Sequence, residues 1–112
     1  MIITITSIKL RSLWKFFKLS LHGMKVMQQA KSQKGFIKMK NTGFGYWHYT
    51  LSAWETEEDV KNFSKSGAHL LAMKESQALS TEIGIYTYES DKMPDWNEAK
   101  ELVKEKGRVL RF

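Results

Sequence analysis

YWHYTLSAWETEEDVKNFSKSGAHLLAM, residues 46–73, is the stretch of sequence that decides the fold. Its first part, residues 46–55, is rich in aromatic residues, which favour β-strands. Its second part opens with Thr56 and a cluster of acidic residues, with Asp59 in a capping-box position, as is typical of a helix N-terminus. We therefore predict a strand that leads directly into an amphipathic helix.

Strands and helices alternate on both sides of this stretch. Hydrophobic periodicity and turn residues predict, in chain order, a strand at 2–8, a helix at 13–32, a strand at 36–40, a turn at 41–45, a strand at 46–55, a helix from Thr56 to about Ala78, a strand at 81–89 and a helix at 95–106 closed by Gly107. Residues 108–112 are expected to form an edge strand or a docked tail. The order β-α-β-β-α-β predicts an α+β, ferredoxin-like fold with an antiparallel sheet and an extra C-terminal helix, as a single domain over residues 1–112.

Gly67 lies inside the second predicted helix. A glycine there costs about 1 kcal/mol relative to alanine, so we expect either a bend or the close approach of another segment. In an unbroken helix Phe63 and Gly67 share the inner face, and His69 points nearly opposite. A bend at Gly67 would turn His69 toward the sheet, so both orientations of this side chain stay open.

The first predicted helix has an apolar stripe at helical spacing. Its members are Leu13, Phe17, Leu21 and Met24, with Trp14 beside them. Leu19 and Val26 lie outside this stripe, which indicates that the helix contacts more than one surface. The opposite face carries Lys15, Lys18, His22 and Lys25. We expect His22 to be solvated among these lysines.

The predicted strands have two different faces. We assign Ile3, Leu51, Ile83 and Ile85 to the face that two helices cover. The other face then holds Tyr46, His48, Thr50, Trp54 and Tyr86. This mixture is too apolar for water and too polar for a dry core, and it suits a cavity where two sheets meet. We therefore predict a homodimer in which two sheets meet to form a barrel, with a monomer that leaves this face open as the alternative.

The candidate site is built on that second face. His48 and His69 are the candidate catalytic residues, because imidazole exchanges protons near neutral pH. The candidate ligand-binding residues are Tyr46, Thr50, Trp54, Phe63 and Tyr86. Structural roles in hydrogen bonding or packing are the alternative for each of them. No metal site is expected, because the three histidines are widely spaced and the chain has no cysteine.

Composition narrows the classes of function. The net charge of +6 permits nucleic acid or anionic lipid as a partner, but basic residues occur throughout the chain, so we interpret the excess as a solvated surface and expect no nucleic-acid partner. Lysines interrupt the apolar N-terminal segment, so no membrane span is expected and a cytoplasmic location is the default. A nucleic-acid or membrane-surface binder that uses the basic first helix stays open as a minor alternative.

Residues 50–74 resemble a pattern of the dimeric α/β-barrel superfamily, which includes the antibiotic-biosynthesis-monooxygenase-like proteins. The pattern is a strand T-x-S-x-W, an acidic helix start, a phenylalanine and then S-G-x-H. The matching residues are Thr50, Ser52, Trp54, Phe63, Ser66, Gly67 and His69. The chain looks most like DUF3291-type proteins and, more distantly, the spheroidene monooxygenase group.

The resemblance implies a ligand held between the helices and the sheet. It also implies monooxygenase or haem-linked chemistry, which leaves haem open as a cofactor. Our leading hypothesis is a homodimer that binds a small hydrophobic or aromatic ligand and acts as a monooxygenase-like enzyme. The alternative is a non-catalytic dimer that binds a small ligand or haem.

Overall fold

A computed structural model gives the structure of residues 1–65 and 67–112, with the backbone alone for residues 68–72. Its elements are β1 (Ile2–Leu10), the 3-10 helix η1 (Leu13–Lys15), α1 (Phe16–Lys31), β2 (Phe36–Phe44), β3 (Trp47–Trp54), α2 (Glu57–Ser64), α3 (Gly67–Leu79), β4 (Ser80–Glu89), α4 (Trp96–Lys106) and β5 (Arg108–Arg111). The sheet has the strand order β2-β3-β1-β4-β5, and all neighbouring strands are antiparallel. The predicted α+β ferredoxin-like fold with an extra C-terminal helix is therefore confirmed.

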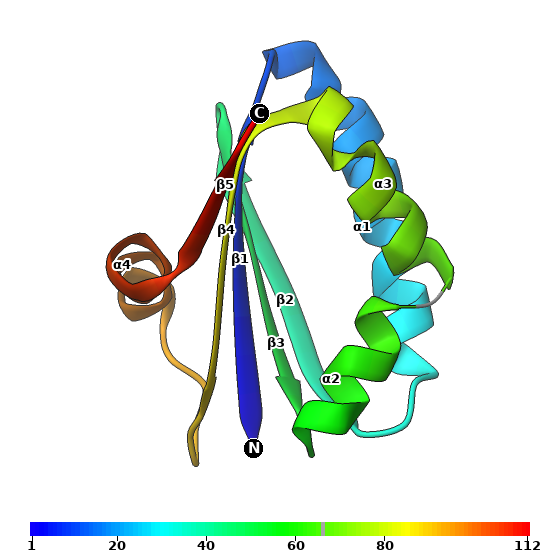
Figure 1. Cartoon of the computed structure of the whole chain (residues 1–112), viewed down its shortest axis with the longest axis vertical. Helices are drawn as coiled ribbons and strands as arrows, with labels where there is room; N and C mark the ends of the chain where they lie inside the picture. The colour runs from blue at the N-terminus through cyan, green and yellow to red at the C-terminus, as the bar shows by residue number, and fades with distance from the viewer. Residues whose placement is uncertain (66) are drawn as a thin grey trace.

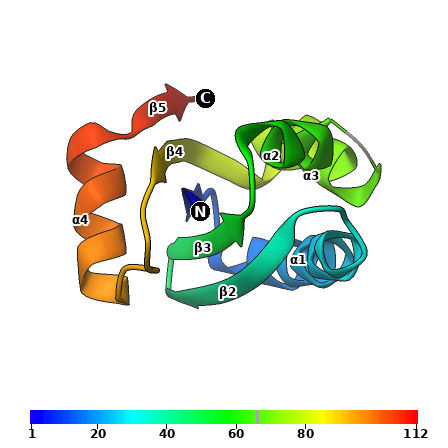
Figure 2. The ribbon, with the colours of Figure 1, turned by 90° about the horizontal axis from the view of Figure 1, so that it is seen from below.

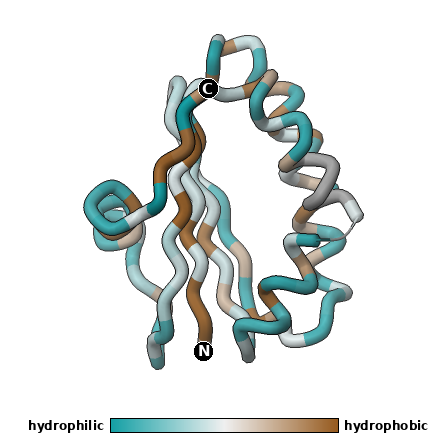
Figure 3. Tube along the Cα trace, in the orientation of Figure 1, coloured by the Kyte–Doolittle hydropathy of each residue, from teal (hydrophilic) through white to brown (hydrophobic). Residues whose placement is uncertain are grey.

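Three layers make up the molecule (Figure 1). Helices α1, α2 and α3 lie on one face of the sheet, and α4 lies alone on the other. Seen from below, α1 lies beside β2, and α2 and α3 lie on the side of β4 (Figure 2). The most hydrophobic residues lie along the strands, between the helices on the two faces of the sheet (Figure 3). Within the described residues, no helix combines the length and apolarity that crossing a membrane requires.

Two element boundaries differ from the prediction. Strand β2 continues through the stretch 41–44, so the predicted turn at 41–45 is wrong, and Gly45 and Tyr46 alone form the turn. Gly45 has a φ of +64°, which glycine adopts at no steric cost. The second predicted helix is two helices, because α2 ends at Ser64 and α3 begins at Gly67, whose φ is +57°. Of the two possibilities left open at Gly67, the structure shows both, because one helix ends before this residue and the Gln29 side chain lies close to it.

The predicted N-cap of α2 is present, whereas Ser12, expected from the sequence as the cap of the first helix, makes no side-chain capping hydrogen bond. The side chain of Thr56 accepts a hydrogen bond from the backbone N–H of Asp59 at 3.1 Å and so satisfies one of the free donors at the start of α2. The carboxylate of Asp95 does the same for the N–H of Glu98 at 2.8 Å in α4. Residues 108–111 form the edge strand β5, which pairs with β4.

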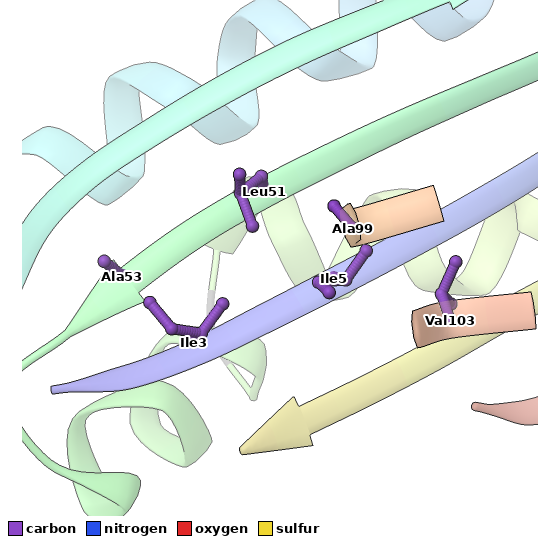
Figure 4. Packing of buried hydrophobic residues seen from close by; sticks show 6 residues of the cluster. All are labelled: Ile3, Ile5, Leu51, Ala53, Ala99 and Val103. Atoms are coloured by element: carbon purple, nitrogen blue, oxygen red, sulfur yellow. The ribbon is translucent and has the colours of Figure 1, made fainter. Parts of the chain in front are cut away.

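The core on the α4 side is formed by a cluster of apolar residues. Alternate residues of β1 and β3 point toward α4, and its side chains close over them (Figure 4). The members of this cluster are Ile3, Ile5, Leu51, Ala53, Ala99 and Val103, each at most 2% exposed. A second cluster of buried residues lies on the opposite face and consists of Ile2, Ala30, Trp54 and Phe63.

The two faces of the sheet are therefore assigned differently from the prediction. Ile3 and Leu51 face α4, not the helix pair. Ile83 and Ile85 lie opposite Ile8 and Thr6 of β1 and so face α1 and α3 instead. The prediction was wrong because alternation fixes the faces within one strand, but the relative phase of two strands depends on their register.

Candidate functional site

A cavity of about 410 Å³ lies between α1 and the sheet. The residues that line it come from β1, α1, β2 and β3. They are Ile8, Phe16, Leu19, Ser20, Gly23, Met24, Met27, Asn41, Thr42, Gly43, His48, Tyr49 and Thr50. The lining is mainly apolar, with a small number of polar groups at the strand end. Cavities of this size and character are typical of small-molecule sites.

The imidazole of His48 is part of this lining. Its Nε2 lies 3.0 Å from the carbonyl oxygen of Gly45. A carbonyl only accepts hydrogen bonds, so Nε2 carries the proton and Nδ1 is left as the proton acceptor. The ring also stacks on Phe16, with centroids 5.2 Å apart and planes at 29°. The orientation of the imidazole is thus fixed from two sides.

Gly43 makes room for this histidine. Gly43 and His48 are partners across the β2–β3 ladder. A Cβ atom at position 43 would overlap Nδ1 of His48, and it would come within 2.7 Å of Cγ. The absence of a side chain at Gly43 is therefore what lets the ring lie flat across the neighbouring strand.

The predicted site residues fall into separate places. His48 and Thr50 both line the cavity, as predicted. Tyr46 lies in the turn, 46% exposed, outside the lining. Trp54 and Phe63 stack on each other in the second core cluster, with ring centroids 4.8 Å apart. Because six residues of extended strand separate it from His48, Trp54 lies about 20 Å away.

Tyr86 lies on the other face of the sheet. It is the ladder partner of Ile5, stacks on Tyr88 with centroids 5.3 Å apart, and packs against the α4 core. The side chain of His69 is outside the described residues, although its backbone belongs to α3. Of the seven predicted site residues, the structure thus brings together His48 and Thr50.

Helix α1 supplies the cavity wall that sequence reasoning missed. Phe16, Leu19, Ser20, Gly23 and Met27 face the sheet. The sequence prediction followed the apolar stripe of larger residues, which lies on a different face of the helix. Leu19 carried a usable signal, because it fell outside that stripe and indicated a second contact surface.

A hydrogen-bonded pair joins α1 to α3 behind this wall. Nε2 of His22 lies 2.7 Å from Oε2 of Glu75, and Lys18 Nζ lies 3.3 Å from the same oxygen. The hydrogen bond with His22, followed by that with Lys18, holds the pKa of Glu75 below its usual value. The side chain of His22 is 11% exposed, so the expectation of a solvated His22 was wrong. The side chain of His22 is shielded from solvent because α3 packs alongside α1.

The described residues do not fit a haem. Iron needs an imidazole nitrogen that faces the ligand. In His48, Nε2 is bonded to Gly45 and Nδ1 lies against Gly43, so neither nitrogen is presented to the cavity interior. Among the described side chains, no three of His, Asp or Glu gather around a common point that could hold a metal ion.

The comparisons with known proteins agree on the fold. The sequence matches no family model and none of the curated proteins. In structure, the chain is similar to Rv0793 from Mycobacterium tuberculosis, with a TM-score of 0.74 and 10% identity over 81% of this chain and 95% of that one. It is also similar to a protein described as a "putative antibiotic biosynthesis monooxygenase" from Nitrosomonas europaea, with a TM-score of 0.72 and 11% identity over 82% and 100% of the two chains.

A third similar structure is SnoaB, a cofactor-independent oxygenase from Streptomyces nogalater. Its TM-score is 0.65, at 10% identity over 81% of this chain and 93% of that one. At such identities the likeness concerns the fold. The chain therefore has the ferredoxin-like fold of the antibiotic-biosynthesis-monooxygenase-like proteins.

Proposed function

We propose that this protein binds a small aromatic or hydrophobic molecule in the cavity between α1 and the sheet and oxygenates it. The observation that carries the proposal is a largely apolar cavity of about 410 Å³ with one fixed imidazole in its lining. An apolar lining favours a planar aromatic ligand by removing its surface from water. The fold shared with SnoaB, an oxygenase that needs no cofactor, supports the same chemistry.

In the proposed reaction His48 acts as the general base. Rotation of the imidazole away from Gly43 turns Nδ1 toward the cavity, where it accepts the proton of a phenol hydroxyl and so makes the substrate ring electron-rich. The phenolate then reacts with O2 at an activated CH2 group, where a C–O bond forms, one C–H bond breaks and the released proton completes a hydroperoxide. Cleavage of the O–O bond with loss of water leaves a carbonyl. One oxygen atom enters the product, the other leaves as water, and the substrate supplies all the electrons.

Other lining residues serve binding and orientation. Asn41 and Thr50 offer an amide and a hydroxyl group that can hydrogen-bond to substrate oxygens. Phe16 and Leu19 from α1 give the apolar surface against which the ring packs. His69 stays a second candidate for proton transfer, on the resemblance alone.

Oxygen uptake tests this proposal. Purified protein is mixed with hydroxylated aromatic compounds that carry an activated CH2 group, and O2 consumption is followed with an electrode. We expect His48→Gln to lower the rate by about 10²-fold or more, the usual contribution of a general base. Tyr86→Phe, on the other face of the sheet, is the matched control and should leave the rate unchanged. Equal rates for His48→Gln and the original chain would overturn the assignment.

Binding without catalysis is the second candidate. The observation in its favour is that, among the residues that the structure describes, the cavity lining contains no Asp, Glu, Lys or Arg beside His48. A ligand-binding protein would show saturable quenching of tryptophan fluorescence by an aromatic ligand, with no O2 uptake. In that case His48→Gln would change the dissociation constant and nothing else.

We also propose that the protein forms a homodimer and acts in the cytoplasm. Aromatic residues at the margin of the α4 face support self-association, because Trp47 is 36% exposed and Tyr49 and Tyr88 are only half-buried. Burial of these rings raises the pKa of Tyr49 and of Tyr88. Size-exclusion chromatography with light scattering gives the test, since a 13.1 kDa species at micromolar concentration would exclude the dimer.

A further inference from the structure

The apolar stripe of α1 is exposed in the structure. The stripe, its flanking tryptophan and a phenylalanine at the end of β2 form what we call the exposed apolar patch: Leu13, Trp14, Phe17, Leu21, Met24 and Phe44. Their exposed fractions are 53%, 80%, 64%, 60%, 63% and 95%. Single exposed apolar residues are common on proteins, but a contiguous group of this kind marks an interaction surface.

The patch is continuous across two elements. The rings of Trp14 and Phe17 lie 6.4 Å apart between centroids. Leu13 and Phe44 line one shallow hollow of about 290 Å³ between η1 and the β2–β3 turn. Both of these segments lie at the upper end of the molecule in Figure 1. The patch therefore occupies one end of the protein and extends down the outer side of α1.

The charges of the chain are distributed unevenly along the sequence. Residues 1–54 contain nine of the 18 Lys and Arg residues and none of the 12 Asp and Glu residues. Residues 55–112 contain the other nine basic residues and all of the acidic ones. Every residue of the exposed apolar patch belongs to the basic half, and Arg11, Lys15, Lys18 and Lys25 lie near its members in the sequence, although Lys18 is paired with Glu75 of α3. Such asymmetry between two halves of a chain is a signature of binding to nucleic acid or membranes.

We propose that the exposed apolar patch docks this protein on the surface of an anionic lipid bilayer. An amphipathic helix with Trp, Phe and Leu on one side and lysines beside them lies in the bilayer interface, where its apolar residues enter the boundary between head groups and acyl chains. Trp14 and Phe44 provide the aromatic contacts, and tryptophan favours this depth of the bilayer. The neighbouring lysines attract phosphate head groups at about 1 kcal/mol each.

Other occupants fit the patch less well. A second copy of the chain would bring two basic surfaces together, and like charges at an interface oppose association. A nucleic acid would match the charge, but Leu13, Leu21 and Met24 present aliphatic surface, whereas nucleic-acid interfaces are strongly polar. A lipid bilayer with anionic head groups satisfies both the apolar and the basic component.

Vesicle flotation tests the proposal. The full chain is mixed with vesicles of phosphatidylglycerol and phosphatidylcholine, or of phosphatidylcholine alone, at low salt. We expect the protein to float with the anionic vesicles. Its affinity for them should decrease as the salt concentration rises, because salt screens the attraction between opposite charges. We also expect a blue shift of tryptophan emission on binding, and Trp14→Phe should abolish that shift while it retains flotation.

Variants separate the patch from the rest of the surface. The double variant Trp14→Ser/Phe44→Ser should weaken vesicle binding about tenfold or more, because the apolar surface of two aromatic side chains that would leave water on binding is gone. Ile37→Ser removes another exposed apolar residue, 45% exposed, at the opposite end of β2, and should bind as the original chain does. Lys15→Gln/Lys25→Gln should weaken binding about 25-fold on anionic vesicles, in proportion to the charge removed.

Three results would overturn the proposal. The first is equal flotation of the original chain and Trp14→Ser/Phe44→Ser. The second is retention on DNA without flotation, which would identify a nucleic-acid surface. The third is a dimer that Trp14→Ser/Phe44→Ser converts to a monomer, with no vesicle binding by either form, which would assign the patch to a second copy. Circular dichroism confirms that each variant is folded before these comparisons are made.

Discussion

Replacing Gly43 with alanine tests the arrangement that fixes His48 in the cavity. The new Cβ would overlap Nδ1 of the imidazole and approach Cγ and Cε1 within 2.7 Å and 2.8 Å. The β2–β3 backbone is held by its ladder, so the ring has to rotate away. Rotation breaks the hydrogen bond of Nε2 to Gly45 and the stacking on Phe16.

The expected cost follows from these contacts. The hydrogen bond contributes about 0.5–1.5 kcal/mol, and the stacking contributes a similar amount, about 0.5–1.5 kcal/mol. Alanine recovers about 0.5–1 kcal/mol, because glycine in a strand loses more conformational entropy on folding. The net destabilisation of Gly43→Ala should thus be about 1 kcal/mol. In a chain that already carries His48→Ala, the same substitution should be neutral or slightly stabilising.

The test is a double-mutant cycle, in which the free energy of unfolding in urea is measured for the original chain, Gly43→Ala, His48→Ala and the double variant. We expect a coupling free energy of about 1–2 kcal/mol between Gly43 and His48. Gly23→Ala is the matched control, since Gly23 also lines the cavity but nothing lies within 4 Å of its added Cβ. That substitution should stabilise α1 by about 1 kcal/mol. Additive effects of Gly43→Ala and His48→Ala would refute the proposed placement of the ring.

Three further substitutions test the fold and its pH dependence. Ile5→Ala removes a side chain with no exposed surface from the α4 core and should cost about 2–5 kcal/mol in urea unfolding; Val109→Ala, at 36% exposure, is its control. Gly67→Ala should cost about 1–2 kcal/mol, because an L-residue is strained at a φ of +57°; no loss would mean that the start of α3 adopts another conformation. The pKa of Glu75 is lowered from the ordinary value of 4.5, so its carboxylate stabilises the folded state at pH values above 4.5. This stabilisation is lost as the pH falls through the lowered pKa. Glu75→Gln should therefore flatten the acid limb of the stability profile, and an unchanged limb would contradict the pairing with His22.

Local signals in the sequence predicted the order of elements and the N-cap of α2. Thr56 and Asp59 identify the start of α2, because side-chain capping depends on residues three positions apart. Gly67 marked the position where a bend was one of two possibilities, and its positive φ at the start of α3 is a property of this single residue. These features need no knowledge of the rest of the chain.

The faces of the sheet could not be predicted in this way. The alternation of faces within the strand of Ile83 and within the strand of Leu51 was predicted correctly. The two residues nevertheless lie on opposite faces of the sheet. The register that relates them is set by contacts between residues far apart in sequence. The candidate site was partly predictable because His48 and Thr50 lie on one strand, two residues apart, and so share a face whatever the register. Tyr86 comes from another strand and was misplaced by the same error of phase.

The exposed apolar patch and the cavity are two consequences of one orientation of α1. The helix turns Ser20 and Gly23 toward the sheet and Phe17 and Leu21 away from it. With the helix rotated to bury the larger residues, as its periodicity alone suggests, Phe17 and Leu21 would fill the space between helix and sheet, and no cavity would be left. The observed orientation therefore gives up burial of large apolar side chains and also leaves a cavity in the core, and both cost stability. A bilayer that covers the patch and a ligand that fills the cavity would each recover part of that free energy. Vesicles and an aromatic ligand should accordingly each raise the melting temperature, as any partner that binds the folded state alone must do.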